Sequence, residues 1–358
     1  MKTNPKKFNI KLNKHIPIDE FIEKALYEPD VGYYTNKIPF GIKGDFVTAP
    51  TISNLFSEII GIWIVSTWEK LGKPKKFNLV ELGPGDGSLS KVLVETFKKF
   101  PEFNKATRLF LYEKSKLLKN IQRNKINNTK VKWINDFDSI KKGPIIFFGN
   151  EFFDAIPIKQ YSVEKKLFRE KCYKVDQQGL HETYQEASPD DVLNLKSFKV
   201  LNKLKFIEFP KLGLLELDKM IKKISTLSGG ILLIDYGYVN LINRSTLQVV
   251  MKNKKISVDS LFKNLGRADI TSLVNFSLLK EYFSKNNLKV KKIVSQKFFL
   301  EKMGIIERAK ILEKKMTIKQ RNYMSLTLMR LLHKELMGGL FKVIFAFKCK
   351  SSSFLGFK

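Results

Sequence analysis

The ten residues VELGPGDGSL, from Val80 to Leu89, constrain the fold of this chain more than any other segment. An apolar run ends there in three alternating glycines, and a helix-forming sequence follows directly. A strand that enters a helix through a glycine turn is typical of α/β sheets in which a nucleotide lies outside the carboxyl ends of the strands. The segment therefore predicts a ligand site at Gly83, Gly85 and Gly87.

The chain around this turn alternates between strand-like and helix-like segments. FNLVEL, RLFLYEKS and KVKWIND are strand-like, and GSLSKVLVETFKKF and KLLKNIQRNK are helix-like. This alternation predicts an α/β fold with a Rossmann-like parallel sheet and helices on both faces. The apolar runs IIFF and ILLI fit strands that are buried on both sides.

Four parts are expected along the chain. Residues 1–72 form an N-terminal helical and loop extension, which includes a helix near Ile16–Tyr27 and a long binding loop after it. Residues 73–157 and 229–358 form the two parts of the sheet core, and Thr271 is expected to cap a helix in the second part. Between them, residues 158–228 alternate with period two and predict an inserted small antiparallel β/helical region on the substrate side.

The composition limits the partners. The formal net charge is +30, but the excess is almost all lysine and is spread over the whole chain. This spread favours a solvated basic surface over a nucleic-acid partner, and an acidic partner is the alternative. The two cysteines and three histidines lie far apart, so we expect no metal site and a reducing compartment: Cys172, Cys349, His15, His181 and His333.

The chain carries no expected membrane span. A membrane-spanning helix needs about 20 apolar residues. The most apolar helix candidate, Leu55–Trp68, is shorter than that and contains Glu58. The opening sequence MKTNPKKFNIKLNKHIPIDEF lacks the apolar core of a secretory signal, so we expect a bacterial cytoplasmic protein without a signal peptide.

The glycine turn allows three ligands to be compared. A phosphate-binding P-loop needs a Gly-Lys-Ser/Thr ending, which is absent, and the dinucleotide fingerprint needs glycine where Ser88 stands. S-adenosylmethionine fits better, because an acidic residue precedes the glycines and Glu113 follows the next strand, where a carboxylate can accept both ribose hydroxyls. Ordinary glycines in a crossover turn are the simpler alternative. The predicted cofactor-binding residues are Glu81, Gly83, Pro84, Gly85, Gly87 and Glu113, with Asp136 and Phe137 beside the adenine.

A second group of polar residues follows the apolar strand IIFF in the segment GNEFFDAIP. Asn150 is a candidate cofactor contact, and Glu151 and Asp154 are candidate catalytic acids between phenylalanines. Asp235, at the end of the strand ILLI, and Asp45 are further candidates. Acids against aromatic walls suit a flat cation such as a guanidinium. The alternative is a helix N-terminus with favourable charge.

The segments ELGPGDGSL, NEFFDAIPIKQY and LIDYGY resemble the MidA-type family of S-adenosylmethionine-dependent methyltransferases. YEPDVGYYT, GDFVTAPTIS, ADITSLVNF and MGGLFKV are similar to other family segments in the same order. The resemblance implies a class I methyltransferase sheet that binds S-adenosylmethionine. It further implies methylation of a protein arginine, because mitochondrial members methylate an arginine of a respiratory complex I core subunit and assist assembly of the complex.

Two other functions stay open. An RNA methyltransferase would fit the positive charge, although neither an Asn/Asp-Pro-Pro-Tyr/Phe motif nor an appended RNA-binding domain is visible. A non-catalytic assembly chaperone that binds the cofactor needs the same pocket, so the sequence does not separate it from an enzyme.

Overall fold

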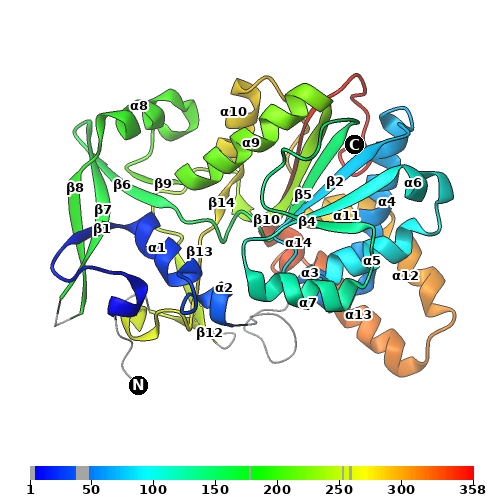
Figure 1. The fold of residues 1–358 in the computed structure, drawn as a ribbon, viewed down its shortest axis with the longest axis horizontal. Helices are drawn as coiled ribbons and strands as arrows, with labels where there is room; N and C mark the ends of the chain where they lie inside the picture. The colour runs from blue at the N-terminus through cyan, green and yellow to red at the C-terminus, as the bar shows by residue number, and fades with distance from the viewer. Residues whose placement is uncertain (1–4, 38–47, 177–178, 252–253, 258–259) are drawn as a thin grey trace.

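The computed structural model describes residues 5–37, 48–176, 179–251, 254–257 and 260–358 (Figure 1). A nine-stranded sheet forms its centre, in the order β15-β17-β10-β5-β2-β3-β4, with β14 paired to β10 and β16 paired to β17. The strands are β2 (Phe77–Leu82), β3 (Thr107–Tyr112), β4 (Val131–Ile134), β5 (Ile145–Asn150), β10 (Gly229–Tyr238), β14 (Val274–Asn275), β15 (Lys289–Val290), β16 (Val294–Ser295) and β17 (Phe341–Lys348).

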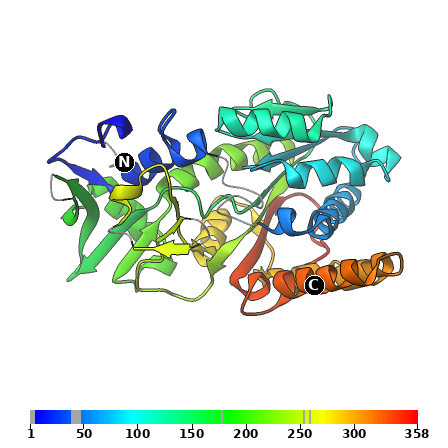
Figure 2. The ribbon, with the colours of Figure 1, turned by 90° about the horizontal axis from the view of Figure 1, so that it is seen from below.

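Both faces of this sheet are covered by apolar cores, as the buried strands predict. In β2, Leu79 packs into the core on one face and Val80 into the core on the other, because successive side chains of a strand point to opposite faces. One face carries α4 (Asn54–Lys70), α5 (Ser88–Phe97), α6 (Pro101–Ala106), α7 (Lys116–Ile126), α11 (Gln296–Lys302), α12 (Ile305–Glu313), α13 (Ile318–Leu332) and α14 (Met337–Leu340). The other face carries α9 (Lys211–Leu227) and α10 (Phe276–Lys285). Figure 2 shows α12 and α13, in orange, along one side of the molecule.

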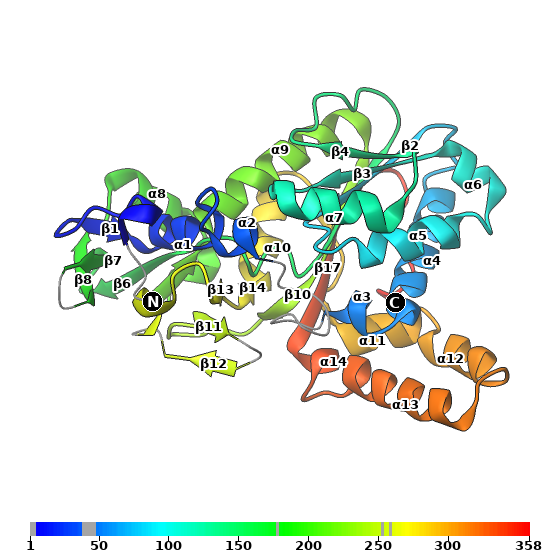
Figure 3. The ribbon, with the colours of Figure 1, turned by 60° about the horizontal axis from the view of Figure 1, so that its bottom comes forward.

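A smaller region of sheet lies at the far end of the molecule (Figure 3). Its strands are β1 (His15–Pro17), β6 (Lys159–Glu164), β7 (Leu167–Val175), β8 (Leu180–Glu186) and β9 (Phe206–Phe209), all antiparallel. Beside it lies a three-stranded sheet of β11 (Gln248–Met251), β12 (Lys254–Ile256) and β13 (Asp269–Thr271). Two short helices, α2 (Tyr33–Asn36) and α8 (Pro189–Ser197), border this region. A third, α3 (Ala49–Ile52), packs with α4 and α5 in the core on one face of the central sheet.

A third apolar core joins the start of the chain to these small sheets. Helix α1 (Ile18–Tyr27) packs its buried Phe21 against Tyr173 of β7, with ring centroids 5.0 Å apart. Val249 of β11 and Ile270 of β13 belong to the same core. The N-terminal segment therefore packs with β7, which precedes β10 in the chain, and with β11 and β13, which follow it. The division of the chain into four parts stays a prediction.

The predicted α/β class is confirmed, and two details differ from the expectation. β17 runs antiparallel between β10 and β15, because α14 delivers the chain to the carboxyl edge of the sheet, from which it can only run back. Thr271 does not cap a helix: it ends strand β13, and Asn275 caps α10 by accepting the backbone N–H of Leu278. Among the described residues, no helix is both long and apolar enough to cross a membrane.

Candidate functional site

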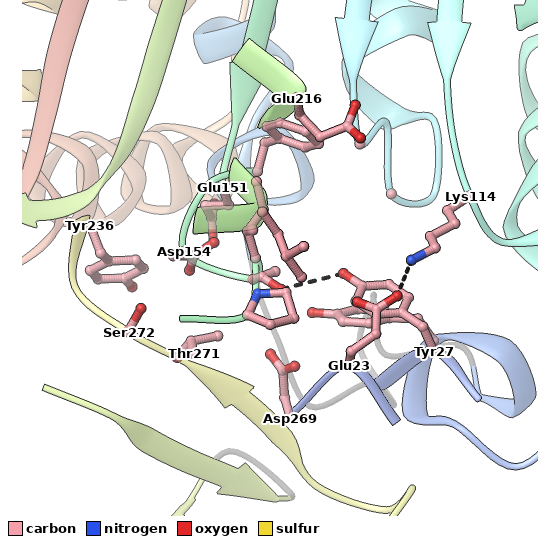
Figure 4. Close-up of a pocket in the computed structure, with 18 of the residues that line it drawn as sticks. Glu23, Tyr27, Lys114, Glu151, Asp154, Glu216, Tyr236, Asp269, Thr271 and Ser272 are labelled. Atoms are coloured by element: carbon pink, nitrogen blue, oxygen red, sulfur yellow. Dashed lines mark hydrogen bonds and ion pairs between the residues drawn. The ribbon is translucent and has the colours of Figure 1, made fainter. Parts of the chain in front are cut away.

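A cavity of about 1140 Å³ lies at the carboxyl ends of β2, β3 and β5 (Figure 4). Five of the predicted site residues line it: Gly83, Gly85, Glu113, Glu151 and Asp154. They come from three strand ends that are far apart in the sequence, and the parallel register of β2 with β3 and β5 brings those ends to one edge. Residues of α1 and β13 close the opposite side.

The glycine turn adopts a backbone that other residues rarely take. Gly83, Gly85 and Gly87 have φ angles of 60°, 56° and 80°, in the left-handed region where a Cβ is strained. A Cβ on Gly83 would also lie 3.0 Å from Cδ2 of Phe152. The turn therefore needs glycine for its shape, and it leaves bare backbone facing the cavity.

Glu113 lies one residue beyond the end of β3 and is held on both carboxylate oxygens. The backbone N–H of Ser115 donates to Oε1 at 2.8 Å, and Gln122 Nε2 donates to Oε2 at 3.1 Å. Gln122 also donates to the carbonyl of Gly85 at 2.8 Å and accepts from Trp133 Nε1 at 2.8 Å. The buried Gln122 thus fixes the predicted ribose acceptor relative to the glycine turn, a role that no motif in the sequence indicates.

Several predicted cofactor residues do not line the cavity. Glu81 is 3% exposed beneath the turn and accepts the hydroxyl of Ser90, and burial raises its pKa to about 8. Phe137 lies in the core, where its ring is 4.9 Å from that of Tyr112. Pro84, Gly87 and Asp136 also lie away from the cavity wall, and Asn135 lines it instead.

The exit of β5 places two acids on the cavity wall. Glu151 has a φ of 54°, a strained value for a residue with a side chain, and strain of this kind is found where the surrounding structure holds a functional group in place. Burial, and next the neighbouring Asp154, raise its pKa to about 8. Asn150 donates to Glu151 Oε1 at 2.9 Å, and its own Oδ1 is buried without a hydrogen-bond partner among the described residues.

Asp235 lies behind this wall rather than on it. It is 1% exposed, and its Oδ2 accepts the backbone N–H groups of Phe153 at 2.8 Å and of Asp154 at 3.3 Å. Burial raises the pKa of Asp235 to about 8, and burial and then Asp235 and Asp269 raise the pKa of Asp154 well above its usual range. Asp235 therefore shapes the β5 exit, while Asp154 faces the cavity.

Asp45 lies outside the described residues. The cavity also contains side chains that were not predicted as site residues: Tyr27, Tyr34, Asn135, Tyr236 and Asp269. The segments YEPDVGYYT and ADITSLVNF contain three of them, Tyr27, Tyr34 and Asp269, but the sequence alone does not bring these segments to the glycine turn.

The lining fits the parts of S-adenosylmethionine. Glu113 presents carboxylate oxygens at the position where they can accept ribose hydroxyls, and a carboxylate has room for about four hydrogen bonds. The glycine backbone allows close approach, and Leu118, Phe152 and Ile156 supply apolar surface. Glu151 and Asp154 favour a ligand with positive charge nearby.

Comparison with known proteins agrees with this geometry. Residues 59–294 match the model of a protein family described as "Putative S-adenosyl-L-methionine-dependent methyltransferase". The relatives include the mitochondrial protein arginine methyltransferase NDUFAF7 of Xenopus tropicalis, 27% identical over 86% of this chain and 76% of the relative. The mouse protein of that name is 28% identical over 85% of this chain and 74% of the relative.

A solved structure shares the fold. A Burkholderia thailandensis protein bound to S-adenosyl-homocysteine superposes with a TM-score of 0.81, covering 95% of this chain and 89% of that one at 20% identity. The family match covers well over half of the chain and includes the glycine turn, Glu113 and the β5 exit. The chain therefore belongs to this family, as a class I methyltransferase whose methyl donor is S-adenosylmethionine.

Proposed function

We propose that this enzyme methylates the guanidinium of an arginine in a protein substrate. The observation that carries the proposal is the pair of acids, Glu151 and Asp154, on the cavity wall next to the glycine turn. A guanidinium is planar and always charged, and its N–H groups form a fork that matches carboxylates. An acidic pocket beside the methyl donor therefore suits an arginine acceptor.

The relatives support the same acceptor. NDUFAF7 from several animals carries the name protein arginine methyltransferase. The family resemblance extends the proposal to the partner, a subunit of respiratory complex I, whose assembly the methylation would support.

The donor side rests on Glu113 and the glycine turn. S-adenosylmethionine supplies a methyl group on a positively charged sulfur. Glu113 would accept the ribose hydroxyls, with Gln122 holding the carboxylate in place through its hydrogen bond of 3.1 Å. The bare backbone at Gly83 and Gly85 would lie against the donor, and Asn150 would offer its buried Oδ1 as an acceptor.

The acceptor side rests on the β5 exit. Glu151 and Asp154 would accept N–H groups from two guanidinium nitrogens, which leaves the third nitrogen to face the donor. Asp235 would act through Asp154, because it holds the backbone of the exit. One of the acids can take the proton that the methylated guanidinium releases, and Asp45 stays a predicted contributor. Holding the reactants in this geometry removes much of the entropic cost of the reaction.

The lining argues against RNA as the acceptor. RNA binding depends on lysine and arginine contacts to phosphates. The cavity wall presents the carboxyl groups of Glu113, Glu151, Asp154 and Asp269. Lysines also line it, but Lys114 and Lys219 are paired with acids of the same wall. These carboxylates would repel a phosphate backbone, despite the positive net charge of the chain.

Labelling with a radioactive donor tests the proposal. The purified protein is incubated with methyl-tritiated S-adenosylmethionine and an extract of cells that lack its gene, and labelled products are digested for mass spectrometry. We expect methylarginine in protein. Label on RNA or on lysine would contradict the proposal.

A matched pair of variants ties the label to the cavity. Glu151→Gln keeps the shape of the side chain and removes its charge, so we expect label to fall while donor binding is retained. Glu102→Gln makes the same change at an exposed position of α6 and should methylate like the wild type. Full activity of Glu151→Gln with bound donor would remove Glu151 from the acceptor site.

A further inference from the structure

Asp269 approaches the cavity from a different sheet than the other acids. It begins β13, where it is paired with Val250 of β11, and it is 2% exposed. Figure 4 shows its carboxylate directed into the cavity from the side opposite Glu151 and Asp154. A ligand between the two walls would therefore meet acids on both sides.

The charges of the two walls act on one another. The Asp269 carboxylate contributes to raising the pKa values of Asp154, Tyr27 and Tyr34, which places it within electrostatic reach of all three. Buried carboxylates close together repel, and a bound cation relieves that repulsion. The cavity at this point is therefore built for positive charge.

Two lysines of the cavity wall are paired with other acids. Lys114 forms an ion pair with Glu23, and Lys219 forms one with Glu216 at 2.7 Å, while Lys255 of β12 also lines the cavity. Among the residues that the structure describes, no three His, Cys, Asp or Glu side chains are placed to hold a metal ion. An organic cation brought by a ligand therefore fits between these walls better than a metal ion does.

Two tyrosines add a flat wall beside Asp269. The rings of Tyr27 and Tyr34 are stacked, with centroids 5.5 Å apart and planes 22° apart, and both side chains line the cavity. The hydroxyl of Tyr27 donates to the carbonyl of Ala155 at 3.4 Å, directly after Asp154. Lys114 Nζ already lies over the Tyr27 ring, 4.4 Å from its centroid, so this aromatic wall is one that attracts positive charge.

We propose that Asp269 binds the acceptor guanidinium from the side opposite Asp154 and so positions it. The acceptor site is therefore complete only where β13 faces the exit of β5. The inference rests on the proposed function, because it assumes an arginine acceptor. It adds a residue from a separate sheet and makes the charge of the acceptor the basis of selection.

Calorimetric titration with a pair of small probes tests this role. The protein, saturated with S-adenosyl-homocysteine, is titrated with acetyl-arginine amide and with acetyl-citrulline amide, which has nearly the same shape but no charge. We expect the wild type to bind the arginine probe more tightly. Asp269→Asn should weaken arginine binding by about tenfold, the loss of one hydrogen bond to a charged group, and should leave citrulline and donor binding unchanged.

The controls separate the possible failures. Asp190→Asn makes the same change at an exposed position of α8 and should bind both probes like the wild type. If Asp269→Asn does not melt cooperatively, Asp269→Ser, which is also neutral, replaces it. A folded neutral variant with wild-type arginine binding overturns the role of Asp269 alone. A wild type that does not distinguish the two probes overturns the arginine acceptor as well.

Discussion

The side chain of Asp235 accepts the backbone N–H of Phe153 at 2.8 Å, which fixes the exit of β5 to the end of β10. The same oxygen accepts the N–H of Asp154 at 3.3 Å, and Oδ1 accepts the N–H of Tyr236 at 2.9 Å. One buried carboxylate therefore organises the backbone of two neighbouring strand ends. The position of Asp154 on the cavity wall is therefore set by the buried Asp235 behind it.

Asp235→Asn should lower turnover and leave donor binding nearly unchanged. The amide keeps the size of the carboxylate but replaces one acceptor oxygen with a donor, so the β5 exit loses part of its support. We expect kcat to fall roughly tenfold, because the loss of one hydrogen bond that holds the β5 exit would misplace the acid on the cavity wall. Kinetics with saturating donor measure the change, and Asp190→Asn is the control. Unchanged kcat would show that the exit holds its shape without Asp235.

Gly83→Ala should abolish or strongly weaken binding of S-adenosylmethionine. The left-handed backbone and the nearby Phe152 both oppose a Cβ there, so the turn must shift. Gly72→Ala is the matched control, because Gly72 also has a positive φ, of 85°, but its Cβ would meet no atom within 4 Å. Calorimetry should show donor affinity lost in the first variant and kept in the second. Equal donor affinities of the two variants would show that the glycine turn does not form the donor site.

Binding of the arginine probe should strengthen as the pH rises toward about 8. Glu151 has a pKa of about 8, so it is mainly neutral below that pH and charged above it, while arginine stays charged throughout. Burial and then Asp154 raise this pKa, while the hydrogen bond from Asn150, the backbone of Ala49 and the charge of Arg330 lower it. Between pH 6 and 9, the affinity for the arginine probe should therefore rise more steeply with pH in the wild type than in Glu151→Gln. Parallel curves would contradict a charged contact at Glu151.

Glu81→Gln should change the pH dependence of stability. Glu81 has a pKa of about 8 in the folded protein against an ordinary value of 4.5, so between these values the folded state binds more protons than the unfolded state. The wild type should therefore lose up to ~1.4 kcal/mol of unfolding free energy per pH unit relative to the variant as pH rises through this window. Urea unfolding at pH 5, 7 and 9 measures the difference. A constant difference would mean that Glu81 does not titrate there.

Local patterns were sufficient to identify Gly83, Gly85 and Glu113, the predicted cofactor residues that line the cavity. The strand, the glycines and the helix that follow Val80 are adjacent in sequence, and Glu113 lies one residue beyond the end of the next strand. Their chemistry can be read without knowledge of the rest of the chain. The same holds for Glu151 and Asp154, which directly follow a buried strand.

Other features of the cavity depend on contacts that the sequence does not show. Asp269 lies in a segment that resembles the start of a helix, and its place in β13 depends on pairing with β11. Phe137 follows a strand in the way a cofactor contact would, yet its side chain packs into the core against Tyr112 and Phe147. Gln122 has an ordinary position in α7, and only the fold brings it to Glu113.

The antiparallel pairing of β17 with β10 affects how the protein can be made. The ribosome synthesises β17 after every other strand of the central sheet, yet it lies between β10 and β15, paired with β10 from Gly229 to Tyr236. Until Lys348 has left the ribosome, this edge of β10 has no strand beside it. A nascent chain that already contains the glycine turn, both β5 acids and Asp269 still has an unpaired edge on β10, in the middle of its sheet. Unpaired strand edges invite aggregation. Translation thus completes the scaffold only after the last acid of the pocket has been made.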